Sequence, residues 1–252
     1  MKICAVIPAA GLGKRLNASV PKLLLPLTAT KTVWSVLRLK LVDRVDHIHV
    51  VVSPQGEDLI RRALADDVSC GLVSISVQSL PIGMGDAIFQ GYAVWSQAEQ
   101  IMVVWGDQAF VSKKTFKRSL AAHGGGAHTI ALPLTFVADP YVEYLFDVDL
   151  GLIAVKQVRE GDSCSAKGLA DVGTFVMSVR DLLPAWHAYL KRASRGVKTK
   201  EINFLPFLPF LAVNGWHIEP VHVANPIEAR GINTPEDLLY IHRRRLKQHW
   251  YL

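Results

Sequence analysis

The stretch Val6-Ile-Pro-Ala-Ala-Gly-Leu-Gly-Lys-Arg15 joins an apolar strand to a glycine-containing loop, and Lys22 adds a second cation seven residues after Arg15. The continuous apolar run at 3–7 is typical of a strand covered on both faces. Gly11 and Gly13 allow the backbone to turn sharply, and backbone amides in such a turn can face phosphate oxygens. The stretch therefore predicts a first strand followed by a loop that binds a nucleoside triphosphate.

Two better-known phosphate loops do not fit this stretch. A Walker A loop ends in Gly-Lys-Ser/Thr, whereas Gly13-Lys14 is followed by Arg15. The dinucleotide-binding fingerprint needs a small residue where Leu16 stands. An ordinary glycine turn is the remaining structural alternative, and the added cations Arg15 and Lys22 favour phosphate binding over it.

Length and composition indicate one large domain, since the chain has 252 residues and 50% hydrophobic content. No apolar run approaches the roughly 20 residues that cross a bilayer, and the first strand leaves no room for a signal peptide, so we expect a cytoplasmic protein. The three cysteines lack metal-ligand spacing and are expected to be free thiols. The net charge of +6 suits anionic partners. We expect no nucleic-acid partner, because the basic runs at 191–200 and 243–247 are typical of solvated faces.

Strand-like and helix-like stretches alternate along the first half, which is typical of an α/β sheet with parallel strands. Strands are expected at 3–7, 47–52, 73–77, 101–105, 128–134 and 173–179, with a hairpin or two short strands at 150–158. Helices are expected at 32–40, 56–64, 83–97 and from Thr234, and the run 204–211 is expected at an edge of the core. Ligands bind beyond the carboxyl ends of parallel strands, so the loops at Gly11, Gln78 and Asp107 are expected to converge there.

A set of short motifs carries a family resemblance. The motifs are Ala9–Leu16, Pro21-Lys22 with Pro26-Leu27, Gln78 with Gly83, Trp105-Gly-Asp107 and Gly231-Ile-Asn233. Together they resemble the nucleotidylyltransferases that activate sugar 1-phosphates, and among them the uridylyltransferase domain that acts on N-acetylglucosamine 1-phosphate. The resemblance is good over 3–110, thin from about 135 to 210, and good again over 221–246.

The resemblance implies an α/β fold with a glycosyltransferase-A-like, Rossmann-related mixed central sheet and flanking helices. It also implies a single domain over 1–252, with a nucleotide-binding half at 1–110, an acceptor-binding half at 111–230 and a closing helix at 231–252. The family joins a nucleoside triphosphate to a phosphorylated acceptor and releases pyrophosphate. Bifunctional relatives carry a long acyltransferase domain, which we do not expect here because the chain stops soon after the closing helix.

The resemblance also implies roles for individual residues. Arg15 and Lys22 would be catalytic, the arginine on the leaving pyrophosphate and the lysine on the α-phosphate. Gln78 would read the base, because a glutamine amide is both donor and acceptor. Asp107 and Asn233 would hold Mg²⁺, which needs only one or two protein oxygens when phosphates supply the rest. The full nucleotide-binding set implied by the family is Ala9, Ala10, Gly11, Gly13, Arg15, Lys22, Gln78, Gly83 and Asp107.

The acceptor half departs from the family pattern. Met84 stands where the family has a threonine, the glycine that the family has near Tyr141 is missing, and Asp171 replaces an asparagine. The register of the family's sugar-binding glutamate within 157–160 is open. Asp171 is nevertheless the residue expected to bind the acceptor, which is left open as a sugar 1-phosphate or a related small phosphate.

The leading hypothesis is a magnesium-dependent nucleotidylyltransferase that uses UTP. Residues 6–15, Lys22 and 51–54 also resemble cytidylyltransferases for alditol or methylerythritol phosphates, so a CTP enzyme for an alditol or amino-alcohol phosphate is an alternative. Asp147-Val-Asp149 has the D-x-D form of glycosyltransferases, but it lies far beyond Asp107 and is expected to face solvent. A protein that binds a nucleotide sugar without catalysis is the last alternative. The sequence leaves the oligomeric state open.

Overall fold

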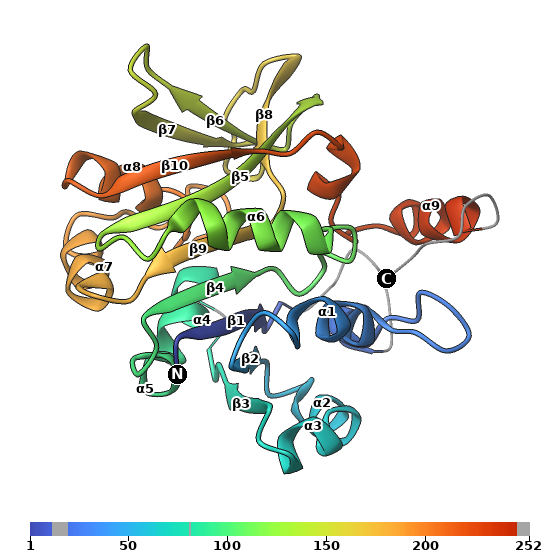
Figure 1. The fold of residues 1–252 in the computed structure, drawn as a ribbon. Helices are drawn as coiled ribbons and strands as arrows, with labels where there is room; N and C mark the ends of the chain where they lie inside the picture. Colours follow the sequence, from blue (N-terminus) through green and yellow to red (C-terminus); the bar gives the residue numbers. More distant parts are fainter. Residues whose placement is uncertain (12–19, 81, 246–252) are drawn as a thin grey trace.

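An eight-stranded mixed sheet forms the centre of the molecule in the computed structural model, which describes residues 1–11, 20–80 and 82–245 (Figure 1). Seven strands follow the spatial order β10 (His217–His222), β5 (Thr129–Ala138), β9 (Thr174–Ser178), β4 (Gln100–Val104), β1 (Ile3–Ala9), β2 (His47–Val52) and β3 (Val73–Val77). The eighth strand, β8 (Lys167–Asp171), pairs with β5. β9 and β8 run antiparallel to their neighbours, and the other pairs are parallel. The expected mixed central sheet is confirmed.

Helices cover both faces of this sheet. β1 presents Ala5 and Ile7 to one face and Cys4 and Val6 to the other, and all four side chains are fully buried because successive side chains of a strand alternate. The first face is covered by α1 (Val33–Leu41), α2 (Glu57–Ala63) and α6 (Lys113–His123), and α9 (Pro235–Arg245) packs against the same core cluster beyond the end of the sheet (Figure 1). The second face is covered by α4 (Met84–Gln90), α5 (Tyr92–Trp95), α7 (Leu182–Leu190) and α8 (Phe207–Val213). The short helix α3 (Ala65–Ser69) packs beside β3.

A separate two-stranded sheet, β6 (Val142–Phe146) and β7 (Leu152–Gln157), projects beside β5 and β8 (Figure 1). The expected pair of short strands within 150–158 is wrong, because this segment supplies one strand whose partner precedes it. Asp147 explains the difference: its carboxylate accepts a hydrogen bond from the amide of Asp149 (3.0 Å) and places the chain reversal before β7. Both aspartates are exposed, as expected of a solvent-facing turn.

The remaining expectations are close to the structure. The expected strands at 47–52 and 73–77 coincide with β2 and β3, and α9 begins directly after Thr234. The segment 83–97 forms two helices interrupted at Gly91, instead of one. The run 204–211 packs into the core as expected, and it also forms the first part of α8. None of the helices within the described ranges has the length and apolar character required to span a membrane.

Candidate active site

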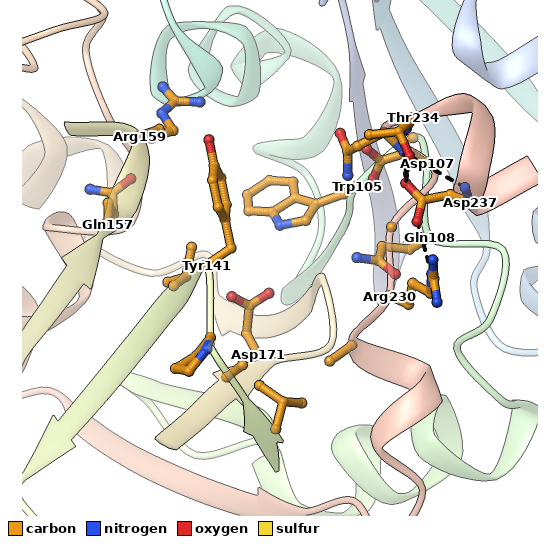
Figure 2. Close-up of a pocket in the computed structure, with 18 of the residues that line it drawn as sticks. Trp105, Asp107, Gln108, Tyr141, Gln157, Arg159, Asp171, Arg230, Thr234 and Asp237 are labelled. Carbon is orange, nitrogen blue, oxygen red and sulfur yellow. Dashed lines mark hydrogen bonds and ion pairs between the residues drawn. The ribbon is translucent and has the colours of Figure 1, made fainter. Parts of the chain in front are cut away.

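A cavity of about 1260 Å³ lies at the carboxyl ends of β1 and β4. Ala9 and Gly11 line it after β1, and Trp105 to Gln108 line it after β4. Figure 2 shows two groups of polar side chains at its opposite ends, with Trp105 and Tyr141 between them. The position agrees with the rule that open α/β sheets bind ligands beyond the carboxyl ends of their strands.

At one end of the cavity, Lys22, Asp107 and Asn233 meet although they are far apart in the sequence. The Lys22 ammonium donates to Asp107 Oδ2 (3.0 Å) and to Asn233 Oδ1 (2.7 Å). Lys22 begins the short 3₁₀ helix η2 (Lys22–Leu24), and the fully buried Leu23 anchors this turn in the core. Three residues expected in one reaction centre are therefore brought into direct contact.

Main-chain and capping hydrogen bonds hold this end together. The amide of Ile232 donates to the carbonyl of Asp107 (3.1 Å), which ties the two segments that carry Asp107 and Asn233. The Asp237 carboxylate, in the first turn of α9, accepts hydrogen bonds from the amides of Asn233 and Thr234 (both 2.8 Å), and Figure 2 shows it beside Thr234. The start of α9 thus fixes the position of Asn233.

A buried lysine supports the loop that follows Asp107. Lys40 of α1 is 7% exposed, and its ammonium donates to the carbonyl of Ala109 (2.7 Å). Burial lowers the pKa of Lys40 to about 8, although the carboxylate of Glu228 opposes this shift. Glu228 lies in η4 (Pro226–Ala229) and accepts a hydrogen bond from the amide of Ser112 (2.8 Å). Lys40 and Glu228 thus both hold the segment that follows Asp107, and Glu228 links this segment to η4.

The oxygens of Asp107 and Asn233 suit a magnesium ion. In the structure they hold a cation already, because the Lys22 ammonium lies between them. Within the described residues, there is no cluster of three or more His, Cys, Asp or Glu side chains arranged to hold a metal. Magnesium does not need such a cluster where substrate phosphates and water complete its shell, so the donor pair fits this metal.

Asp171, the residue expected to bind the acceptor, lines the cavity at the end of β8. Its carboxylate accepts hydrogen bonds from the Tyr144 hydroxyl (3.1 Å) and the Gly173 amide (2.7 Å). Burial raises the pKa of Asp171 to about 6, and the charge of Asp107 acts in the same direction. At neutral pH the cavity therefore contains a carboxylate that has lost much of its hydration.

The far end of the cavity is formed by Gln157 and Arg159, which Figure 2 shows beyond Tyr141. Arg159 donates to the Glu201 carboxylate (2.6 Å), so its charge is compensated by a neighbour that also lines the cavity. Glu160 is not among the described residues that line the cavity, and its carboxylate instead accepts from the Thr199 hydroxyl (2.6 Å). Within 157–160, Gln157 and Arg159 are thus the residues that a ligand can reach.

The expected base-reading pair lies outside the cavity lining. Gln78 is 2% exposed, and its amide nitrogen donates to the carbonyl of Gly83 (3.0 Å) and to Asp86 (2.7 Å). Gly83 has a φ of 134°, and a side chain there would collide with the backbone of Ile202 at 2.4 Å. Among the described residues, those that line the cavity include neither of the pair, nor Ala10, although the adjacent Met84 does line it.

Two expected residues, Gly13 and Arg15, lie outside the described residues, so their roles remain predictions. The cavity lining also includes residues that were not expected, among them Gln108, next to Asp107, and Arg230, next to the Gly231-Ile-Asn233 motif. Gln108 is adjacent in sequence to the expected residue Asp107, and Arg230 precedes the expected residue Asn233 by three positions. Both residues could have been predicted from the sequence, because loop residues that follow a parallel strand or flank a ligand-binding motif often contact the ligand.

An enzyme that transfers a nucleotidyl group needs a polyphosphate site next to a pocket for the acceptor. One end of the cavity has charged groups suited to polyphosphate, and the opposite end has separate polar groups suited to an acceptor. The chain is a nucleotidyltransferase. More narrowly, it belongs to the MobA-like NTP transferase domain family, which matches residues 5–196.

Individual proteins support the same assignment. The chain is 27% identical over 244 residues to the bifunctional protein GlmU of Acidithiobacillus ferrooxidans, which covers 94% of this chain and 50% of that protein. It is also 27% identical over 256 residues to GlmU of Kineococcus radiotolerans, with 98% and 50% covered. The chain thus spans about half the length of these curated relatives.

A solved structure shares the fold. It is 4-diphosphocytidyl-2C-methyl-D-erythritol synthase from Anaerococcus prevotii, which superimposes with a TM-score of 0.66 over 98% of this chain and 96% of that chain. The two sequences are 17% identical, so this similarity concerns the fold alone.

Proposed function

We propose that the protein transfers a nucleoside monophosphate from a nucleoside triphosphate, UTP in the first place, to a sugar 1-phosphate or a related small phosphate. The contact of Lys22 with Asp107 and Asn233 is the observation that supports this most, because it places a cation and two hard oxygen donors at one end of a cavity. A phosphate oxygen of the acceptor attacks the α-phosphorus, the bond between the α-phosphorus and its bridging oxygen breaks, and pyrophosphate leaves.

Each polar group at this end has a separate task in the proposed reaction. Asp107 and Asn233 hold Mg²⁺, which when bound neutralises charge on the phosphate oxygens. Lys22 leaves its two protein partners and moves onto the α-phosphate, where a lysine ammonium stabilises the charge of the transition state. No protein nucleophile is required, since the acceptor phosphate is the nucleophile. Arg15 keeps its predicted role on the pyrophosphate.

The acceptor binds on the other side of Trp105, according to this proposal. Asp171, Gln157 and Arg159 line that part of the cavity and supply both hydrogen-bond acceptors and donors. The length of the cavity, with the two polar ends separated by aromatic side chains (Figure 2), suits a substrate whose phosphate reaches Lys22 while its other end contacts this group.

The test is pyrophosphate release from each of four nucleoside triphosphates, with Mg²⁺ and a panel of sugar, alditol and amino-alcohol phosphates. We expect release only when the metal and an acceptor are both present, and fastest with UTP; CTP as the preferred donor would favour the cytidylyltransferase alternative. Asp107→Ala should reduce the rate by about 100-fold or more, the scale for loss of a group that stabilises transition-state charge. Near wild-type release by this variant would refute the metal assignment.

A further inference from the structure

Gln108 is a buried polar residue whose side-chain amide oxygen has no hydrogen-bond partner in the described part of the chain. It is 5% exposed, it lines the cavity, and its Oε1 atom is both inaccessible to solvent and unpaired. A buried amide without partners is unfavourable, and native proteins seldom keep one without a reason. Its place next to Asp107 and inside a substrate cavity suggests that the missing partner is a ligand.

The Gln108 side chain occupies space that is free only because the neighbouring residue, Gly173, has no side chain. Gly173 has a φ of 74°, and a Cβ at that position would lie 2.2 Å from Cγ of Gln108. The amide of the same glycine donates to Asp171 Oδ1 (2.7 Å). One glycine thus allows Gln108 and Asp171 to approach the cavity from adjacent positions, where any other residue would displace Gln108.

Among the residues that the structure describes, no charged side chain balances the charge of Asp171. Its two hydrogen-bond donors, the Tyr144 hydroxyl and the Gly173 amide, are neutral, and no Lys, Arg or His of the described ranges forms an ion pair with it. Arg159, the cation that the described residues place at the far end of the cavity, is already paired with Glu201. A desolvated carboxylate in a substrate cavity favours a ligand that brings a positive charge.

Aromatic side chains surround the same position. Figure 2 shows Trp105 and Tyr141 in the middle of the cavity, with the Asp171 carboxylate directed toward the space between them. The indole of Trp105 is held in place by Phe175 and Phe204, whose ring centroids lie 5.2 Å and 5.8 Å away. Faces of tryptophan and tyrosine rings attract cations, most strongly where water is excluded.

We propose that Gln108 and Asp171 contact the acceptor directly and select one that carries an ammonium group. This inference rests on the proposed function, because that function makes the ligand a phosphorylated acceptor. The ammonium group lies beside the Trp105 ring, where Asp171 and Gln108 approach the cavity from either side of Gly173, and it donates to the Asp171 carboxylate and to the amide oxygen of Gln108. The amide turns to make this bond, which an amide side chain can do without a change of shape.

The experiment compares matched phosphates that differ only in having an amine or a hydroxyl group. Binding is measured by calorimetry on the full chain for phosphoethanolamine against 2-hydroxyethyl phosphate, and for glucosamine 1-phosphate against glucose 1-phosphate. The same four compounds are then tested for pyrophosphate release with UTP and CTP. We expect the amine of at least one pair to bind about tenfold or more tightly, the usual scale of a hydrogen bond to a charged group.

Variants assign the preference to individual residues. Asp171→Asn keeps the size of the side chain and removes its charge, so the ratio of amine to hydroxyl binding should fall by about tenfold, while Gln108→Leu should reduce it by a smaller factor. Asp149→Asn and Gln97→Leu change exposed residues outside the cavity and should leave the ratio unchanged. A ratio is insensitive to a general loss of folded protein, which would lower both affinities together.

The outcomes separate this inference from the proposed function. Amine-selective binding without pyrophosphate release from any nucleotide would support the inference and refute the proposed reaction. Pyrophosphate release at equal efficiency with amine and hydroxyl acceptors, or a preference that survives Asp171→Asn, would overturn the inference and leave the proposed reaction intact.

Discussion

Replacing Lys22 with Met tests whether the lysine occupies the position of the metal in the ligand-free protein. Its ammonium lies 3.0 Å from Asp107 Oδ2 and 2.7 Å from Asn233 Oδ1, so these oxygens cannot bind the lysine and a magnesium ion at once. The Lys22 and Asp107 side chains are 24% and 18% exposed, and we take a partly buried ion pair with one further hydrogen bond to contribute about 1–2 kcal/mol. Mg²⁺ must displace this contact in the wild-type protein.

The variant should therefore bind Mg²⁺ about tenfold more tightly than the wild type in the absence of nucleotide, since 1.4 kcal/mol corresponds to a factor of ten. Its rate of pyrophosphate release should nevertheless fall by about 100-fold or more, because the charge on the α-phosphate loses its stabilising ammonium. Opposite changes in metal affinity and turnover are not expected from simple damage to the fold.

Calorimetric titration with MgCl₂ measures the affinity, and thermal unfolding confirms that the variant is folded. Lys117→Met is the matched control, because Lys117 is an exposed lysine of α6 that does not line the cavity. If Lys22→Met bound Mg²⁺ no more tightly than the wild type and the control, the competition between ammonium and metal would be refuted.

Two further predictions concern stability and positioning. Burial lowers the pKa of His49 from its usual 6.5 to about 4, and the ring is hydrogen-bonded to Ser74 and Ser76. The unfolded chain therefore binds more protons between these two values, so the free energy of unfolding should decrease as the pH falls from about 6.5 to about 4, by up to about 3 kcal/mol. Urea unfolding across this range measures the slope, which should become smaller in His49→Gln; an equal slope in both proteins would contradict the assignment. Asp237→Ala removes the carboxylate that holds the amide of Asn233 and should lower the free energy of unfolding by about 1–2 kcal/mol while raising the Mg²⁺ concentration needed for half-maximal activity. An unchanged Mg²⁺ requirement in a destabilised Asp237→Ala protein would show that this residue only caps α9.

The sequence predicted those parts of the fold that depend on local patterns. The apolar run of β1 and the exact extents of β2 and β3 follow from strand-like hydrophobicity between turn signals. The meeting of Lys22, Asp107 and Asn233 could also be predicted, because motifs after parallel strands converge at one edge of a sheet. These contacts depend on topology more than on side-chain packing.

Elements of the second half depend on long-range contacts, so they could not be predicted from local sequence patterns. The sequence of β8, Lys-Gly-Leu-Ala-Asp, carries little strand signal, and it becomes a strand because β5 supplies its hydrogen bonds. α6 begins with charged residues, and its Phe116 is buried against the sheet. The helix was therefore hard to predict without knowledge of that packing. The orientation of Gln108 depends on the absence of a side chain at Gly173, which lies far away in the sequence.

The two ends of the cavity are supported by different parts of the fold, and this bears on how specificity arises. The metal-binding candidate Asp107 follows β4, which is paired on both sides within the main sheet, and its carbonyl is tied to Ile232. Asp171, in contrast, ends β8, which lies off the main path of the sheet and packs beside β6. Changes at Asp171 therefore disturb fewer strand pairs than changes near Asp107. If the proposed function holds, a scaffold of this kind can alter its acceptor while it retains the same geometry for the triphosphate, so the proposed acceptor is inferred from the local chemistry around Asp171.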